Sequence, residues 1–351
     1  MYNITRIPAV NKQFCAQIQA VIDNKTKPLG SLGKLESVAL QLALLQSQNA
    51  SFTSQKITIP KPVMVIFAAD HGIADQGVSI ASSDVTGQMV ANFIDGGAAI
   101  NCFCRANNID LYIVDAGIKN ALDCESESFF VKRLGSGTAD FSLQAAMTRE
   151  QVQQGLEFGQ QVVTKLTEKG ENILLLGEMG IANTSSASTL MCALSNYQAE
   201  LCVGKGTGIT EQQYRHKLAL IKKALTRLRE EDDLLTILAQ FGGFEIVQMV
   251  GAILAAGKQK IPIVIDGFIV SIAALVAYRL APNILDYFIF SHQSDEQGHQ
   301  LLLQEMSASP LLSLGLRLGE GTGAALAWPL IQAACYFYND MASFESAGVT
   351  V

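Results

Sequence analysis

Glu320 stands in the turn best suited to chemistry, flanked by glycines in the stretch LGLRLGEGTGAALAWP (314–329). Three glycines within five residues weaken regular structure, but they let backbone and ligand approach closely. The apolar run 324–335 that follows predicts a helix. A carboxylate held at the mouth of a helix can serve as an acid or base toward a bound ligand. The alternative is a solvated glutamate that complements the helix dipole.

Two further glycine-rich turns have the composition of an anion site. GEMGIANTSSAS (177–188) follows an apolar run, and its Asn-Thr-Ser-Ser cluster predicts a helix start whose free N–H groups bind phosphate. GKGTG (204–208) adds Lys205, and Lys217 lies in the next helical segment. An ordinary helix cap and a solvated lysine are the alternatives. Neither turn matches a Walker loop or a dinucleotide fingerprint, so an adenine dinucleotide is not favoured.

A metal site is the main competing interpretation. Asp70, His71, His292 and His299 have ligand-type side chains, but their spacing matches no known zinc pattern. Histidines satisfied within a polar loop are therefore the favoured interpretation. No Ser-His-Asp motif is evident and GxSxG is absent, which argues against a serine hydrolase.

Five short apolar runs must position these side chains, and each ends in an acid, a glycine or a histidine. Runs without alternation fit strands covered on both faces. Helical segments lie between them, which predicts a parallel sheet with ligands beyond the carboxyl ends of its strands. The acids Asp70, Asp115, Glu178 and Asp266 are therefore expected to converge in one crevice. The runs are 63–69, 111–114, 173–176, 263–265 and 287–290, and the helical segments are 85–106, 149–169, 212–229 and 244–256.

Composition narrows the class of protein. The 351 residues are 49% hydrophobic and 16% charged, with net charge −7, which predicts a large core and a subunit interface. No basic block occurs, so nucleic acid is not an expected partner. The longest apolar stretch, 267–278, is too short to cross a membrane, and the chain begins without a signal-peptide pattern. Seven cysteines without CxxC predict reduced thiols in the cytoplasm.

Ten segments, in order along the chain, resemble the nicotinate-nucleotide–dimethylbenzimidazole phosphoribosyltransferase family of the cobalamin nucleotide-loop pathway. They are KPLGSLGKLE, AADHGIADQGVS, GGAAIN, VDAGI, GEMGIANTSSAS, GKGTGI, GGFEI, VIDGFIVSIAAL, SHQSDEQGH and LGLRLGEGTGAALAWP. Each segment alone is a weak signal, whereas the ordered set is specific.

The resemblance implies an α/β fold with a doubly wound, mostly parallel (Rossmann-like) sheet. A second, small helical domain is expected from both chain ends, with residues 60–323 in the large domain and 1–59 plus 324–351 in the small one. A homodimer is also implied. The implied reaction moves phosphoribose from nicotinate mononucleotide to dimethylbenzimidazole, giving α-ribazole phosphate and nicotinate with anomeric inversion. No metal and no organic cofactor is implied.

The resemblance also assigns site residues. Glu320 and Glu178 match the two site glutamates, and Ser82 and Ser83 are alternatives for one pocket serine. The substrate-binding positions are Gln88, Ser82, Ser83, Gly180, Ile181, Gly204, Lys205, Gly206, Thr207, Gly208, Lys217, Asp266 and Ser294.

Two other functions remain open from the residues alone. A metal-dependent hydrolase would use the four ligand-type side chains, and a non-catalytic regulator would bind the nucleotide without releasing nicotinate. The accepting base also remains open, because adenine, phenolics or other benzimidazoles would fit a flat apolar slot.

Overall fold

Six strands form one sheet in the computed structural model, which describes residues 6–47, 56–195, 197–206 and 208–350. The strand order is β3-β2-β1-β4-β5-β6, and every neighbouring pair is parallel. The doubly wound parallel α/β prediction is therefore confirmed. The strands are β1 (Pro62–Ala69), β2 (Asp110–Gly117), β3 (Phe129–Val131), β4 (Ile173–Met179), β5 (Ile263–Ile265) and β6 (Phe288–Phe290).

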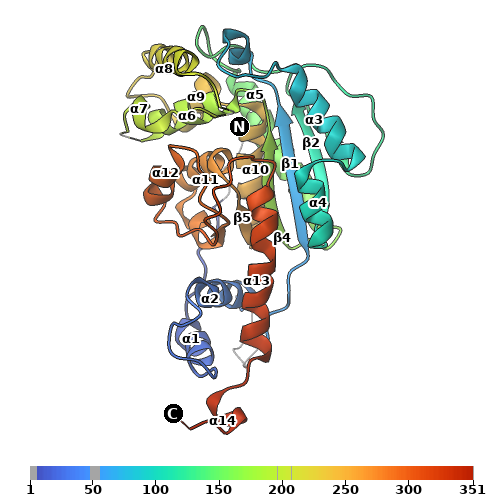
Figure 1. Ribbon diagram of the computed structural model, residues 1–351, viewed down its shortest axis with the longest axis vertical. Helices are drawn as coiled ribbons and strands as arrows, with labels where there is room; N and C mark the ends of the chain where they lie inside the picture. The colour runs from blue at the N-terminus through green and yellow to red at the C-terminus, as the bar shows by residue number, and fades with distance from the viewer. Residues whose placement is uncertain (1–5, 48–55, 196, 207, 351) are drawn as a thin grey trace.

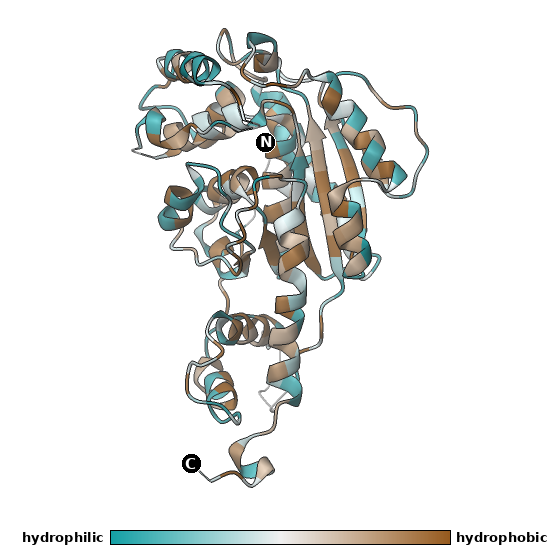
Figure 2. Ribbon diagram, viewed as in Figure 1, coloured by the Kyte–Doolittle hydropathy of each residue, from teal (hydrophilic) through white to brown (hydrophobic). Residues whose placement is uncertain are grey.

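Helices cover both faces of the sheet (Figure 1). α3 (Asp84–Asp95), α4 (Ala99–Ala106) and α13 (Thr322–Asp340) lie on one face, and α5 (Arg149–Thr167) and α10 (Phe244–Lys258) lie behind the other. All eight residues of β1 are buried, as a strand covered on both sides requires. Figure 2 shows the same pattern as largely hydrophobic strands beneath helices with mixed faces.

The remaining helices surround the carboxyl ends of the strands or lie at the chain ends. They are α1 (Cys15–Asp23), α2 (Lys34–Gln46), α6 (Asn183–Leu194), α7 (Ala199–Cys202), α8 (Glu211–Leu225), α9 (Leu234–Phe241), α11 (Phe268–Leu280), α12 (His299–Glu305) and α14 (Phe344–Ala347), with 3-10 turns at Gly72–Gln76 and Pro282–Tyr287. No helix among these described elements is both long and apolar enough to span a bilayer.

Two elements differ from the sequence prediction. A single helix was predicted over 85–106, but Gly96 adopts φ +81° and ends α3, so α4 begins separately at Ala99. A glycine in this left-handed conformation is the usual C-terminal helix stop. β3 was not predicted because a run as short as Phe129–Val131 does not stand out from a loop.

The chain ends meet below the sheet. α1 packs on α2, and α2 packs on α13, which continues from the sheet down to this region (Figure 1). The side chain of Asn339 accepts a hydrogen bond from the Ile57 N–H at 2.7 Å and returns one to its carbonyl at 2.8 Å. A division of the chain at residue 324 falls inside a continuous helix.

Close packing of α5 on α10 allows a stability test. A Cβ at Gly251 would overlap the carbonyl of Leu156 in α5, and backbone atoms cannot rotate away. We expect Gly251→Ala to lower the free energy of unfolding by about 1–3 kcal/mol, the usual cost of overpacking. Chemical denaturation measures this.

Gly87→Ala is the matched control, because Gly87 lies in α3 and a methyl group there would meet no other atom within 4 Å. Alanine's better helix propensity should leave that variant as stable as the parent or more stable by about 0.5–1 kcal/mol. Equal stability of the two variants would show that the α5–α10 crossing tolerates a methyl group.

Candidate active site

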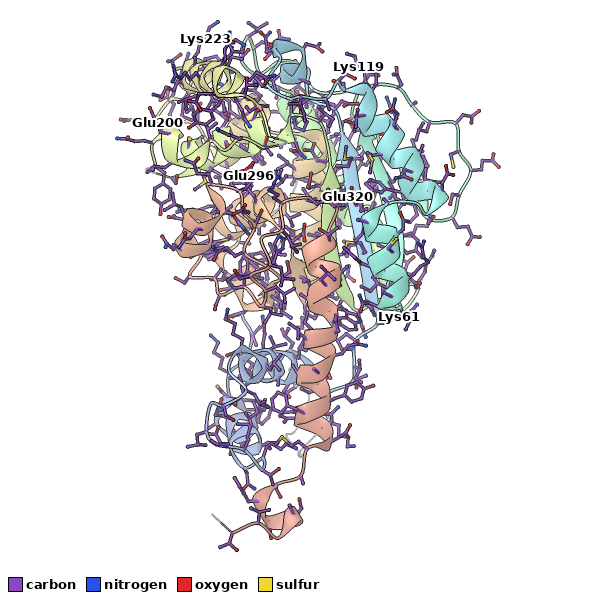
Figure 3. All side chains as sticks on the ribbon, in the orientation of Figure 1. Lys61, Lys119, Glu200, Lys223, Glu296 and Glu320 are labelled. Atoms are coloured by element: carbon purple, nitrogen blue, oxygen red, sulfur yellow. The ribbon has the colours of Figure 1, made fainter. Side chains whose placement is uncertain are left out.

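A cavity of about 640 Å³ opens at the carboxyl edge of the sheet. Its walls come from residues within four segments: 178–184 at the end of β4 and beyond it, 266–270 after β5, 292–296 after β6 and 315–320 ahead of α13. Met89 of α3 and Gly206 complete the lining. Figure 3 shows Glu320 at the upper end of α13 and Glu296 to its left, on the side of α11.

The predicted convergence therefore holds for Glu178 and Asp266 but is wrong for Asp70 and Asp115, which do not line the cavity. Asp115 pairs with Arg133 at 2.7 Å, and Asp70 accepts a hydrogen bond from the Lys119 N–H at 2.6 Å, so other parts of the protein hold these two carboxylates.

Glu320 occupies a strained turn that presses against β4. Gly319, Glu320 and Gly321 all have positive φ, at +83°, +61° and +80°. A non-glycine residue in this region costs roughly 1–3 kcal/mol and is often found at a functional site. A Cβ at Gly177 would lie 2.7 Å from the backbone carbonyl of Glu320. The bare glycine in β4 thus allows the turn to lie directly on the strand.

The Glu320 carboxylate has the properties of a general base. The side chain lines the cavity, the residue is 6% exposed, and Oε2 has no hydrogen-bond partner among the described residues. The N–H of Ile100, in the first turn of α4, donates to the carboxylate. Burial raises the pKa of Glu320, and the charge of Asp266 adds to that rise. Desolvation makes a carboxylate more basic, so Glu320 is better able to accept a proton than a free side chain.

Glu178, at the end of β4, lines the cavity beside this turn. The side-chain amide of Asn183 donates to its Oε2. Burial, followed by the charges of Glu245, Asp266 and Glu320, raises the pKa of Glu178 to about 8, although the hydrogen bond from Asn183 opposes this. Glu178 is therefore protonated over much of the neutral range in the empty cavity. A cationic ligand would favour its ionised form.

Asp266 connects the cavity to the helix that carries Glu320. Its Oδ1 accepts a hydrogen bond from the Ala324 N–H at 2.9 Å, at the start of α13. The N–H groups of Gly267 and Gly323 also donate to this carboxylate. Burial raises the pKa of Asp266, and His292, whose Nδ1 lies 3.6 Å from Oδ1, opposes the rise. Asp266 therefore fixes the start of α13 while lining the cavity.

The start of α6 is less free to bind an anion than the sequence suggested. The Ile181 N–H donates to Thr86 Oγ1 at 3.1 Å, and the Asn183 N–H donates to the Gly180 carbonyl at 3.1 Å. These two groups are therefore already satisfied by the protein. Thr184 and Gly206 line the same cavity.

Lys217 lies directly behind Thr184 and Gly206. The residue is 1% exposed, and its Nζ donates to Thr184 Oγ1 at 2.9 Å and to the Gly204 carbonyl at 3.3 Å. No carboxylate of the described residues lies within ion-pair distance of it. Burial lowers the pKa of Lys217 to about 8, and Glu296 opposes that effect. A buried lysine without an ion pair is suited to an external anion.

Some of the other predicted binding residues line the cavity, and others lie outside it. Gly180, Ile181, Gly206 and Ser294 line the cavity with the two glutamates and Asp266. Ser82 and Gln88 are exposed and Ser83 is buried, and none of these three lines it. Gly204, Lys205 and Gly208 also lie outside the lining, with Lys205 Nζ 3.5 Å from Glu211 at the surface. Thr207 lies outside the described residues.

The histidines of the metal interpretation make separate hydrogen bonds. His71 Nε2 lies 2.8 Å from Glu245 Oε1, with both side chains fully buried. His299 Nδ1 accepts from the Ser294 N–H at 2.8 Å, and Nε2 lies 3.0 Å from Ser271 Oγ. Within the described ranges, no three His, Cys, Asp or Glu side chains are grouped to hold a metal ion.

The supporting roles of four residues were not predicted from the sequence. Ile100 holds Glu320, Asn183 holds Glu178, Thr86 holds the turn after β4, and His299 holds Ser294. Burial lowers the pKa of His299 to about 3, so the ring is neutral and its Nδ1 accepts. The sequence analysis considered His299 only as a candidate metal ligand. The contacts of Ile100 and Thr86 link segments far apart in the chain, so no local motif indicates them.

Anion binding at Lys217 should weaken as the pH rises. A lysine whose pKa is lowered to about 8 is charged below that pH and neutral above it. Glu178, raised to about 8, gains negative charge over the same range and repels an anion further. We expect the dissociation constant for sulfate, whose charge is constant here, to increase several-fold between about pH 7 and about pH 9. Calorimetric titration measures it, and pH-independent binding would contradict a role for Lys217.

Comparisons with known proteins show which sequences and structures this chain resembles. A family model described as "Phosphoribosyltransferase" matches residues 7–349. The nicotinate-nucleotide–dimethylbenzimidazole phosphoribosyltransferase of Vibrio vulnificus is 56% identical over 342 residues, 97% of this chain and 100% of that protein. The enzyme of the same name from Photobacterium profundum is 56% identical over 353 residues, covering 100% of both chains. The crystal structure of CobT from Thermus thermophilus superposes with TM-score 0.91 at 38% identity, covering 96% of this chain and 99% of that one.

Proposed function

The chain belongs to the nicotinate-nucleotide–dimethylbenzimidazole phosphoribosyltransferase family, and on that premise we propose how its cavity performs the reaction. The enzyme transfers phosphoribose from nicotinate mononucleotide to dimethylbenzimidazole, a step in forming the lower ligand of cobalamin. The main support for the proposed roles is the buried Glu320 carboxylate, which lines the cavity. One of its oxygens, Oε2, has no hydrogen-bond partner among the described residues.

Glu320 is the general base in this proposal. One ring nitrogen of the benzimidazole attacks the anomeric carbon, while the other loses its proton. Glu320 Oε2 has no other hydrogen-bond partner in the described structure, so it is free to accept that proton. The donating N–H of Ile100 orients the carboxylate without neutralising it. Attack opposite the departing nicotinate inverts the anomeric carbon in one step.

Glu178 and Asp266 supply negative charge near the reacting sugar. The donor substrate carries a pyridinium ring, and its ribose carbon becomes oxocarbenium-like as the ring departs. Both carboxyls are buried with raised pKa values, so an arriving cation shifts each toward the ionised form. Fixed charge directed at developing positive charge lowers the barrier without solvent reorganisation. Nicotinate leaves as a stable ring, so the leaving group needs no acid.

Lys217, with Thr184 and Gly206 beside it, is the proposed phosphate anchor, and the role of Ser294 is still a prediction from the resemblance. The buried ammonium lies behind Thr184 and Gly206, which line the cavity. Anchoring the phosphate fixes the ribose, which supplies orientation for the attack. The roles of Gly180, Ile181, Gly204, Lys205, Gly208, Gln88, Ser82 and Ser83 remain predictions from the resemblance.

Product analysis tests this function directly. Purified protein is mixed with nicotinate mononucleotide and dimethylbenzimidazole, and we expect equal amounts of α-ribazole phosphate and nicotinate. Substituting adenine or a phenolic for dimethylbenzimidazole ranks the accepting bases. Nucleotide binding without nicotinate release would instead identify a non-catalytic regulator.

We also propose a homodimer in the cytoplasm, with residues 60–323 as the large domain and 1–59 plus 324–351 as the small one. Large exposed hydrophobic side chains support a subunit contact, including Leu29 at 75% and Tyr336 at 53% exposure in the region where the chain ends meet. Sedimentation would measure the oligomeric state.

A further inference from the structure

Glu296 occupies an unusual place for an acidic side chain. It follows β6 in the loop that carries Ser294, and it lines the same cavity as Glu320. Figure 3 shows it beside the region between α6 and α11. A Cβ at Gly204 would lie 2.6 Å from Glu296 Oε2 and 3.2 Å from Oε1. The carboxylate therefore lies directly against the glycine-rich turn at 204–206.

The groups around this carboxylate are those that bind a phosphate. The Gly206 N–H and the Gln297 N–H donate to it, and Lys217 and Arg317 attract it. Two backbone N–H donors with two cations form an anion cradle. A protein carboxylate therefore lies beside groups of the kind that would bind the substrate's phosphate in the proposed reaction.

Glu296 forms no ion pair with the two cations of this cradle in the described structure. Neither Lys217 nor Arg317 comes within ion-pair distance of it among the described residues, and Lys217 Nζ donates to Thr184 and to the Gly204 carbonyl instead. Burial raises the pKa of Glu296, which is the largest effect on it. A partly desolvated carboxylate with long-range cations is displaced more readily than a tight ion pair.

We propose that Glu296 is an internal competitor for the phosphate of the substrate, so that its carboxylate must leave the 204–206 turn before the nucleotide binds fully. This proposal rests on the proposed function for the identity of the substrate. It makes Glu296 a determinant of nucleotide affinity rather than a group that reacts. A phosphate dianion and an ionised carboxylate cannot share one cradle without strong repulsion.

Glu296→Gln tests the competition, because glutamine keeps the size of the side chain and a carbonyl acceptor while removing the charge. We expect the KM for nicotinate mononucleotide to fall about fivefold or more. We also expect the concentration of inorganic phosphate needed for half-maximal thermal stabilisation to fall by a similar factor. Each variant is compared with its own melting temperature without phosphate, so a change in stability does not obscure the result.

Asp295→Asn is the matched control. Asp295 is the exposed neighbour, does not line the cavity and carries the same charge, so that variant should bind phosphate as the parent does. Adding Lys217→Gln to Glu296→Gln should abolish the gain, which places the phosphate in this cradle. An unchanged or weaker response to phosphate in Glu296→Gln would overturn the proposal. The phosphate titration needs no turnover, so it stands even if product analysis disproves the transferase.

Discussion

Glu320→Gln is expected to lower kcat by roughly 10²- to 10⁴-fold, the usual contribution of a general base. The substitution keeps the size of the side chain and its hydrogen bond from the Ile100 N–H, but an amide oxygen cannot take the proton of the benzimidazole. The fall should appear in kcat with little change in KM, because in the described structure the phosphate anchor Lys217 donates to Thr184 and to the Gly204 carbonyl and not to Glu320. Single-turnover measurements of nicotinate release isolate this step.

Two checks accompany this experiment. The pKa of Glu320 is raised by burial, so the parent enzyme should lose activity as the pH falls through a value above that of a free carboxyl. The part of this loss of activity at low pH that is due to Glu320 should be absent from Glu320→Gln. Glu178→Gln should reduce activity less, since it stabilises charge without accepting the proton. Activity of Glu320→Gln within about threefold of the parent would remove Glu320 from the base role.

Lys217→Gln is expected to raise the KM for nicotinate mononucleotide by about 10- to 100-fold. A charged hydrogen bond contributes about 1.5–3 kcal/mol, which corresponds to that range. The side chain is buried and donates to Thr184 and the Gly204 carbonyl, so its ammonium is fixed at the cradle. Initial rates at saturating dimethylbenzimidazole separate the KM effect from kcat.

Lys205→Gln is the comparison for this variant. Lys205 belongs to the same glycine-rich turn, but its ammonium is 3.5 Å from Glu211 and its side chain is 58% exposed. We expect less than about a threefold change in KM, as for most exposed ion pairs. An equal effect of the two substitutions would mean that the turn rearranges to bring Lys205 to the phosphate.

The sequence determined the architecture because hydrophobic runs and glycines act locally. Five of the six strands follow from uninterrupted apolar runs, each largely buried within the sheet. Glycines at 319, 321 and 323 predicted the turn that carries Glu320. The order of the motifs along the chain indicated the family. A parallel sheet brings the carboxyl ends of its strands to one edge, so the convergence of Glu178 and Asp266 was also predictable.

The tertiary structure alone decided how each side chain is used. Glu320 is oriented by Ile100, which is 220 residues earlier (320 − 100), and Asp266 holds Ala324 at 2.9 Å across the start of α13. Likewise, Lys205 and Lys217 are the same residue type in neighbouring segments, yet the side chain of Lys205 is exposed and that of Lys217 is buried. Burial, hydrogen-bond partners and therefore pKa values depend on contacts between distant segments, and a local pattern does not encode them.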